Sequence, residues 1–314
     1  MQPDIAILVP CYNEEQTIAK VVSDFKQHVP GCNVFVYDNA STDQTAAVAA
    51  SAGAIVRREP LPGKGNVVRR MFADIEADVY VMVDGDDTYD AGSAPALIRK
   101  LMTESLDLVT GARTDVSQQA YRSGHRFGNW MLTSLVAWLF DNRFTDMLSG
   151  YRVMSRRFVK SFPALSSGFE IETELTVHAL QVRVPIAEAP TPYKDRPPGS
   201  HSKLKTVSDG VRILSTIVRL VKEERPLYFF GVLGALFFAL SIAAGYPVVS
   251  EYLRTGLVPR LPTAVLASGL AIIASLCVVC GLILDTVTKG RLEVKRMHYL
   301  QVPIRLKPDG LRGS

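Results

Sequence analysis

The most diagnostic segment of this 314-residue chain is Val79-Tyr80-Val81-Met82-Val83-Asp84-Gly85-Asp86-Asp87. Its apolar first half is typical of a buried strand, and it ends in carboxylates that no residue of the strand can neutralise. Ionised carboxylates this close together repel one another and resist burial unless a cation binds them. The segment therefore indicates either a site for a hard divalent cation, Mg²⁺ or Mn²⁺, or a solvated acidic turn, which Asp and Gly also favour.

Short apolar runs alternate with helical patterns through the first third of the chain. Apolar side chains recur at helical spacing between the five predicted strands, which are residues 5–9, 34–37, 54–56, 79–83 and 106–110. This alternation predicts an α/β domain with a mainly parallel sheet. Ligands of such sheets bind beyond the carboxyl ends of the strands. We therefore expect the polar segments that follow three of these strands to converge, namely residues 10–15, 38–43 and 84–86.

The middle of the chain has a less regular pattern. Residues 126–140 and 171–180 have the apolar spacing of helices, whereas the proline-rich segment 189–199 indicates a loop or extended chain. Residues 206–224 place their apolar side chains on one helical face and Arg212, Arg219 and Lys222 elsewhere. That pattern predicts an amphipathic helix lying in a membrane interface.

Two apolar segments near the C-terminus, residues 226–249 and 261–284, contain no Lys, Arg, Asp or Glu. Each exceeds the ~20 residues that a helix needs to cross a bilayer. Two buried helices of a soluble protein are the alternative, but soluble helices of this length normally carry a polar face. Because only residues 251–260 separate the segments, we predict a two-helix transmembrane hairpin.

The cations around this hairpin predict its orientation. The connecting segment contains only Arg254 and Arg260, whereas twelve cations flank the hairpin on its outer sides: Lys203, Lys205, Arg212, Arg219, Lys222, Arg225, Lys289, Arg291, Lys295, Arg296, Arg305 and Lys307. By the positive-inside rule, both ends of the chain, with the domain that precedes the hairpin, are expected in the cytoplasm. These clusters also explain the net charge of +4 without a nucleic-acid partner.

Seven short motifs occur in a fixed order along the chain. They are residues 10–14, residues 38–43, Gly63-Lys64-Gly65, Asp84-Gly85-Asp86, Gly111-Ala112-Arg113, Asp146-Met147-Leu148-Ser149-Gly150-Tyr151-Arg152, and Arg196-Pro197-Pro198-Gly199-Ser200-His201-Ser202-Lys203. With this set the chain resembles the glycosyltransferase family 2 enzymes, and among them the polyprenyl-phosphate glycosyltransferases related to dolichyl-phosphate mannose synthase. The hairpin is similar to that of the membrane-anchored bacterial branch, whose members often form homotetramers.

The resemblance implies four segments. Residues 1–205 would form a GT-A catalytic domain, which is a Rossmann-like α/β fold with a mainly parallel sheet. Residues 206–225 would form the amphipathic juxtamembrane helix, residues 226–288 the transmembrane hairpin, and residues 289–314 a basic cytoplasmic tail. The expected location is the inner membrane, with two spans.

The resemblance also implies a nucleotide-sugar site. Its donor-binding residues would be Pro10, Tyr12, Glu14, Asp38, Lys64, Asp84 and Gly85. Asp86, together with Asp84, would hold Mg²⁺ or Mn²⁺. Lys64 lies between two glycines, but Asn66 follows Gly65, so the P-loop pattern is absent. A flexible loop beside the donor and a plain surface loop both remain open for Lys64.

The resemblance also implies an acceptor site made of four cations and one serine. Arg113, Arg126, Arg196, Ser202 and Lys203 would bind the lipid phosphate, although a lone Arg is usually a surface cation. Guanidinium groups suit phosphate because they bind it through two parallel hydrogen bonds. Asp86, Asp146, Arg113 and Arg126 are the expected catalytic residues. Asp146 would orient the acceptor or the donor sugar, or it could simply cap a turn. One of Glu170, Glu172 and Glu174 could reach the sugar.

The expected reaction is metal-dependent, inverting transfer of one sugar to undecaprenyl or another polyprenyl phosphate. UDP-glucose and UDP-N-acetylglucosamine are the favoured donors, and the product would serve modification of cell-envelope glycans. GDP-mannose is the alternative donor. A processive polysaccharide synthase is less well supported, because neither Trp130 nor Trp138 follows an Arg as the typical Gln-x-x-Arg-Trp motif requires. A non-catalytic membrane scaffold is the alternative from another class.

Overall fold

The computed structural model describes residues 3–114, 134–138, 140, 146–168, 170–194, 215 and 218–303. The chain divides into two compact units. The first unit comprises residues 1–210 and 295–314, and the second comprises residues 211–294.

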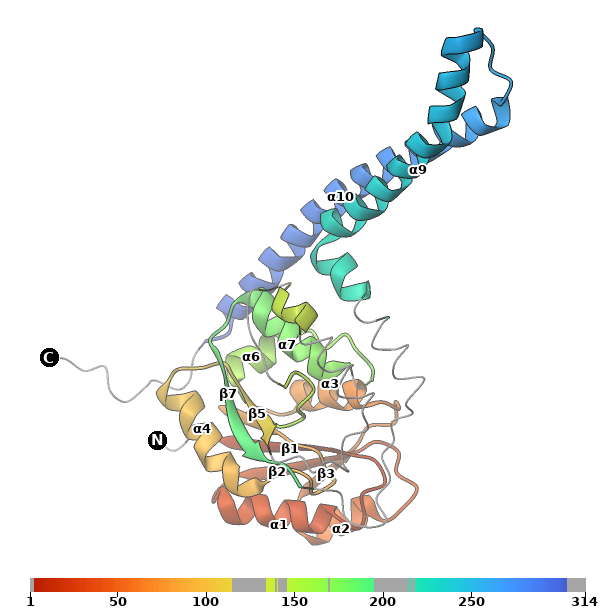
Figure 1. Ribbon diagram of the computed structural model, residues 1–314. Coiled ribbons are helices and arrows are strands. Elements are labelled where there is room, and N and C mark those ends of the chain that lie inside the picture. Colours follow the sequence, from red (N-terminus) through yellow and green to blue (C-terminus); the bar gives the residue numbers. More distant parts are fainter. Residues whose placement is uncertain are drawn as a thin grey trace, which may run out of the picture. The chain divides into compact units, whose positions relative to one another are not determined.

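The first unit is built on a mixed sheet (Figure 1). Among the described residues its strand order is β3-β2-β1-β4-β6-β5-β7. The strands are β1 (Ile5–Cys11), β2 (Asn33–Asp38), β3 (Ile55–Arg58), β4 (Val79–Met82), β5 (Leu108–Thr114), β6 (Arg152–Ser155) and β7 (Ile186–Pro192). β6 is antiparallel to its neighbours β4 and β5, and the other neighbouring pairs are parallel. The predicted α/β architecture is confirmed.

Two strands did not stand out in the sequence. β6 has four residues and carries the charged Arg152 at its start, so it lacks an apolar run of its own. β7 contains Pro190 and Pro192 and lies at the edge of the sheet, where the missing N–H groups of proline are tolerated. Part of the segment predicted as a loop or extended chain therefore belongs to the sheet.

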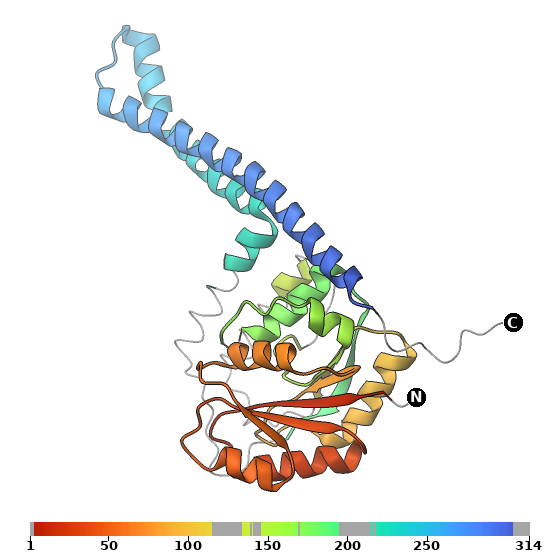
Figure 2. The ribbon, with the colours of Figure 1, turned by 180° about the vertical axis from the view of Figure 1, so that it is seen from behind.

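Helices cover both faces of this sheet (Figure 2). The core on one face includes side chains from α1 (Ile18–His28), α2 (Thr45–Ser51) and α4 (Ala94–Thr103), which follows the short 3₁₀ turn η1 (Ala91–Ser93). The core on the other face includes side chains from α3 (Lys64–Asp74), α6 (Arg156–Ser161) and α7 (Ile171–Val182). In β1, Ile7 and Val9 join the first core while Ala6 and Leu8 join the second. Both faces of β1 are thus buried, as its continuous apolar run predicts.

The second unit contains a helical hairpin formed by α9 (Pro226–Thr255) and α10 (Leu261–Gln301). The helices approach closely at Gly234, where an added Cβ would lie 3.1 Å from the carbonyl oxygen of Ala274. Ser241 Oγ donates a hydrogen bond of 2.7 Å to the carbonyl oxygen of Ala267. In the most apolar 18-residue segment of each helix, only 6% is buried in α9 and 17% in α10. Two long, apolar, exposed helices fit membrane association.

The last turns of α10 belong to the first unit rather than to the hairpin. Tyr299 Oη donates a hydrogen bond of 2.6 Å to Asp107 Oδ2, and Arg157 Nε donates one of 3.1 Å to the carbonyl oxygen of Val302. Lys295 Nζ lies 2.5 Å from Gln181 Oε1. Residues 295–302, which we expected within a basic tail, are therefore packed against the sheet domain. Most of the expected juxtamembrane helix lies outside the described residues, and residues 218–224 are helical.

Candidate functional site

The loops that follow β1 and β2 form one wall of the candidate site. The Asn13 N–H donates to Ser41 Oγ at 2.9 Å, and the Glu14 N–H donates to Thr45 Oγ1 at 2.8 Å. Asp38, at the end of β2, is 5% exposed and accepts a hydrogen bond from the Ser41 N–H. The expected donor residues thus lie at the carboxyl edge of the sheet, Pro10 and Asp38 at the ends of β1 and β2 and Tyr12 and Glu14 in the loop after β1, where a ligand of an α/β fold binds.

Three residues with positive φ occur in these loops and in the loop after β4. They are Asn13 (φ 53°), Ala40 (φ 58°) and Asp87 (φ 57°). Left-handed backbone at a residue with a side chain costs on the order of 1–3 kcal/mol and is concentrated at functional sites. Its occurrence after β1, β2 and β4 supports a functional site at this edge.

The Asp84-Gly85-Asp86 segment after β4 is tightly constrained. An added Cβ on Gly85 would lie 2.7 Å from Cys11 Sγ, so only glycine lets this loop approach the end of β1. Asp86 is 3% exposed, and its Oδ1 accepts hydrogen bonds from Thr88 Oγ1 at 2.6 Å and from the Thr88 N–H at 3.3 Å. The Asp86 carboxylate is therefore held in one orientation rather than solvated in an acidic turn.

Lys64, the first residue of α3, contacts two carboxylates. Its Nζ lies 2.5 Å from Asp84 Oδ1 and 2.5 Å from Glu172 Oε1 on α7. The side chain is only 9% exposed, so a plain surface loop is ruled out. Burial opposes the charged form of Lys64, but the attraction of Asp84 and Glu172 is larger and raises its pKa. A protonated ammonium therefore stands at the first carboxylate of the acidic motif.

The acidic motif fits a divalent cation that is shared with a substrate. Among the described residues, no group of three or more His, Cys, Asp or Glu side chains is arranged to hold a metal ion. Mg²⁺, however, is often bound by one or two carboxylates, with substrate phosphates and waters completing the octahedron. Asp84 and Asp86 provide that oxygen chemistry. The fit is therefore to a cation that arrives with a phosphate ligand.

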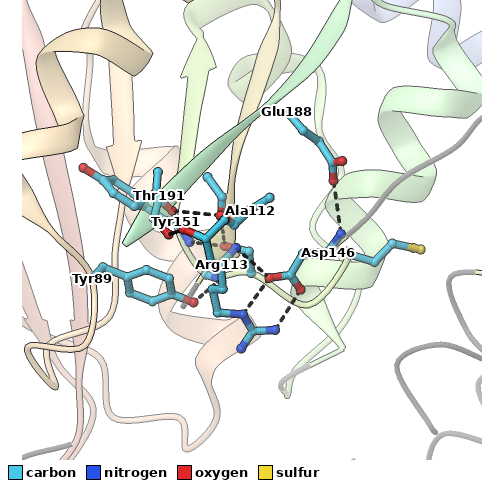
Figure 3. Close-up of polar contacts among 12 residues, drawn as sticks. Tyr89, Ala112, Arg113, Asp146, Tyr151, Glu188 and Thr191 are labelled. Atoms are coloured by element: carbon cyan, nitrogen blue, oxygen red, sulfur yellow. Dashed lines mark hydrogen bonds and ion pairs between the residues drawn. The ribbon is translucent and has the colours of Figure 1, made fainter. Parts of the chain in front are cut away.

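Arg113 and Asp146 form a two-point ion pair (Figure 3). Arg113, on β5, donates from Nε to Asp146 Oδ2 at 2.6 Å and from Nη2 to Asp146 Oδ1 at 2.7 Å. The Asp146 N–H donates to Glu188 Oε1 on β7 at 3.2 Å. The guanidinium carbon of Arg113 lies 5.4 Å from the centre of the Tyr193 ring. The Asp146 carboxylate thus orients an arginine rather than capping a turn.

The loop after Asp146 connects this ion pair to the acidic motif. An added Cβ on Gly150 would lie 2.6 Å from Asp84 Oδ2, so the loop and the Asp84 carboxylate are in close contact. The Gly150 N–H donates to Tyr89 Oη at 2.8 Å. Burial, with a further contribution from Asp84, raises the pKa of Tyr89, which therefore stays neutral. Two candidate groups, the acidic motif and the Arg113–Asp146 pair, consequently share one site.

A fully buried arginine supports the same loop. Arg152 has 0% exposure and donates to the carbonyl oxygens of Met147 at 2.7 Å and Ser149 at 3.1 Å. Its third partner is Thr176 Oγ1 on α7 at 2.9 Å. Burial lowers the pKa of Arg152 from its usual range. Arg152 ends the motif that begins at Asp146, but nothing in the pattern of that motif predicts its burial.

The remaining expected acceptor residues, Arg126, Arg196, Ser202 and Lys203, lie outside the described residues. Of the described site residues, Lys64 contacts Asp84, Arg113 pairs with Asp146, and the loop after β1 is hydrogen-bonded to the loop after β2. The structure also distinguishes the three glutamates of the 170–174 segment. Glu174 accepts from the N–H groups of Leu165 and Ser166, both at 2.8 Å, whereas Glu172 contacts Lys64.

Comparison with known proteins identifies the family. The sequence model of glycosyl transferase family 2 matches residues 6–161. Glycosyltransferase AglJ of Haloferax volcanii is 34% identical over 95% of this chain and 99% of its own length. The dolichyl-phosphate hexose transferase of the same organism is 28% identical over 71% of this chain and 96% of its own length.

A solved structure supports the fold assignment. Glucosyl-3-phosphoglycerate synthase from Mycobacterium tuberculosis, in complex with Mn²⁺, UDP and glucosyl-3-phosphoglycerate, superposes with a TM-score of 0.57 at 25% identity. The match covers 70% of this chain and 79% of that protein. The similarity extends to a GT-A-type enzyme that binds a divalent metal together with UDP. On the strength of its near full-length relative and its matching domain, this chain is a glycosyltransferase and belongs to glycosyl transferase family 2.

Proposed function

We propose that this glycosyltransferase moves one sugar from a nucleotide-sugar to a polyprenyl phosphate, such as undecaprenyl phosphate, at the cytoplasmic leaflet of the inner membrane. The favoured donors are UDP-glucose and UDP-N-acetylglucosamine. One observation carries the proposal. Asp146 pairs with Arg113, and the loop that follows Asp146 brings Gly150 into close contact with Asp84 of the acidic motif. The same chain also has two apolar helices. The contact at Gly150 supports adjacent sites for a metal-bound diphosphate and for a second phosphate.

The donor side rests on the loops after β1, β2 and β4. The base and ribose would lie against the loop of Pro10, Tyr12 and Glu14 and against Asp38. Asp86 and Asp84 would hold Mg²⁺ or Mn²⁺, which supplies positive charge to the diphosphate as it leaves. Mn²⁺ and UDP are bound together by the mycobacterial synthase, which supports this assignment.

The acceptor side rests on Arg113. Its guanidinium is oriented by Asp146 and suits a phosphate, to which arginine can donate two parallel hydrogen bonds. Arg126, Arg196, Ser202 and Lys203 would complete the acceptor site. A hexose transferase of dolichyl phosphate is among the relatives, which supports a lipid phosphate as acceptor.

The reaction follows from the proton chemistry of a phosphate monoester. Its second pKa is ~6, so the attacking oxygen is already anionic near neutral pH and needs no strong base. That oxygen forms a bond to the anomeric carbon as the bond from the carbon to the diphosphate oxygen breaks. The bonding electrons leave with the nucleoside diphosphate, and the anomeric configuration inverts. Arg113 would hold the nucleophile while Asp146 fixes Arg113, so catalysis would come mainly from positioning and charge stabilisation.

The hairpin would keep this site at the lipid surface. By the positive-inside rule, its flanking cations support a cytoplasmic location for both termini. A homotetramer is the assembly that family resemblance favours.

Three alternatives predict different outcomes in a transfer assay. A mannose synthase would use GDP-mannose with the same acceptor, and a processive synthase would release a sugar polymer. A membrane scaffold would make no product, but its acidic motif and oriented arginine would then have no evident purpose. The test incubates the purified chain with polyprenyl phosphate, Mg²⁺ or Mn²⁺, and each of several nucleotide-sugars. A lipid-linked monosaccharide supports the proposal, whereas polymer without lipid-linked product contradicts it.

A further inference from the structure

The ion pairs of Lys64 affect how a metal ion and a nucleotide bind to the site. The single ammonium group is shared between Asp84 and Glu172, both at 2.5 Å. Glu172 is 5% exposed, so its carboxylate has little access to water; Lys64 is the cation in direct contact with it, and the buried Arg152 adds further positive charge nearby. Asp84 is therefore already paired with a cation.

The metal assigned to this site would use the same carboxylate. While the Lys64 ammonium contacts Asp84 Oδ1, its positive charge repels a divalent cation that approaches the same carboxylate and weakens its binding. The diphosphate of a nucleotide changes this balance, since it supplies negative charge both to the metal and to Lys64. Glu172 keeps Lys64 beside the site after its contact with Asp84 is broken.

We propose that Lys64 is a positioning residue that occupies Asp84 in the free enzyme and yields Asp84 when a divalent cation enters with a nucleoside diphosphate. This inference rests on the proposed function of Asp84 and Asp86. Binding of the metal and of the nucleotide is then strongly coupled, and each raises the affinity for the other by the same factor. The enzyme alone binds the metal weakly, which keeps the site from filling with a cation that lacks a donor.

Only the side chain of Lys64 needs to move when it releases Asp84, because the surrounding main chain is held in place. Gly63 and Gly65 flank Lys64 and lie so close to the 166–167 loop that an added Cβ would fall 2.2 Å and 2.1 Å from the carbonyl oxygens of Ser167 and Ser166. The Gly65 N–H donates to the Ser167 carbonyl at 3.1 Å. The main chain at Lys64 is thus fixed, and the long side chain supplies the movement.

The test measures Mn²⁺ binding to the purified full-length chain with and without UDP, by titration followed with electron paramagnetic resonance. In the wild type, UDP should increase Mn²⁺ affinity strongly. Lys64→Gln removes the charge but keeps a hydrogen-bonding side chain. It should tighten Mn²⁺ binding without UDP by roughly tenfold or more and reduce the effect of UDP correspondingly. Lys64→Arg keeps the charge and should behave as the wild type.

Lys20 offers a matched control. Its Nζ also bridges two carboxylates, Asp24 at 2.8 Å and Asp87 at 2.7 Å, next to the acidic motif, but its side chain is 52% exposed. Because solvent screens exposed ion pairs, Lys20→Gln should change Mn²⁺ affinity by less than about twofold. An equal change in both variants would show a general charge effect and overturn the proposal.

Unchanged coupling in a folded Lys64→Gln variant also overturns the proposal. If that variant does not fold, Asp84→Asn gives the second test. It should weaken Mn²⁺ binding much more with UDP than without, and equal weakening contradicts the exchange. A sugar-transfer assay on the wild type separates this inference from the proposed function. Lipid-linked product with unchanged coupling in Lys64→Gln refutes only the role of Lys64, whereas absence of product refutes the function.

Discussion

Arg113 and Asp146 are joined at two points, through Nε and Oδ2 at 2.6 Å and through Nη2 and Oδ1 at 2.7 Å. Asp146 is also bonded to the Arg113 N–H at 3.3 Å, so the carboxylate fixes both the main chain and the side chain of this residue. Residues 33 positions apart on the chain are thereby held as one unit. This unit lies beside Asp84 through the loop of Gly150.

Asp146→Asn should lower kcat/KM for the lipid acceptor by about ten- to a hundredfold, because a charge-assisted contact of roughly 1.5–3 kcal/mol is lost and Arg113 is less well oriented. The measurement is steady-state transfer at varied polyprenyl phosphate, with UDP binding as a second readout. UDP affinity should change little. Glu104→Gln, which removes an exposed ion pair with Lys100, is the control and should leave both quantities unchanged.

Gly150→Ala should displace Asp84, because the added Cβ would fall 2.6 Å from Asp84 Oδ2. We expect binding of Mn²⁺ with UDP to weaken by at least about tenfold, corresponding to ~1.4 kcal/mol, while the fold is retained. Calorimetric titration measures the affinity, and circular dichroism checks the fold. Gly290→Ala, at a position with no atom within 4 Å of the added Cβ, is the control. Normal binding by Gly150→Ala would argue against close contact of the loop with Asp84.

His178 should make the protein sensitive to acid. Burial between Phe158 and Phe162 lowers its pKa from 6.5 to about 3, and among the described residues neither ring nitrogen has a hydrogen-bond partner. Above pH 6.5 the ring is neutral in both states and stability is unaffected. As the pH falls below 6.5, the unfolded chain takes up the proton first, so stability declines by about 1.4 kcal/mol per pH unit until the pH nears the folded pKa.

His178→Leu should remove this decline. Between pH 6.5 and 5, the wild type should lose about 2 kcal/mol more than the variant. Thermal or denaturant unfolding at a series of pH values gives the difference between the two proteins, which cancels the contribution of all other titrating groups. Parallel pH profiles would mean that His178 gains a proton without unfolding, contrary to its burial among aromatic rings.

Tyr299→Phe tests the attachment of the end of α10 to the sheet domain. The change removes the donor of a 2.6 Å hydrogen bond to Asp107, a residue that is 8% exposed. We expect the free energy of unfolding to fall by about 1.5–3 kcal/mol, the usual contribution of a hydrogen bond to a charged group. Tyr252→Phe, at a half-exposed tyrosine of α9, should have no measurable effect. Equal unfolding temperatures for both variants would show that the Tyr299 contact adds nothing to stability.

The sequence alone predicts a strand where the strand itself is a continuous apolar run. β1 and β4 are buried apolar runs followed by polar loops, so the sheet edge that holds the candidate site could be predicted without a structure. β6 and β7 could not, because a buried Arg152 and two prolines contradict the ordinary pattern of a strand. Their assignment depends on the neighbouring strands.

The contacts within the site are also beyond the sequence pattern. Lys64 and Glu172 are separated by 108 residues, and the three alternating glutamates gave no reason to choose among them. The structure distinguishes them because Glu174 is used by the N–H groups of Leu165 and Ser166. The glycines of two motifs are a sequence signal that could have predicted close contacts. Gly85 lies against Cys11 and Gly150 against Asp84, and a larger side chain at either position would clash.

The most direct test of the central claim follows radiolabelled sugar from a nucleotide-sugar into the lipid phase, using full-length protein in vesicles that contain polyprenyl phosphate. The account predicts a lipid-linked monosaccharide whose formation requires Mg²⁺ or Mn²⁺ and the acceptor, and is abolished by Asp86→Ala without loss of the fold. Transfer that continues in Asp86→Ala, or label that appears only in a polymer and never in lipid, would contradict it.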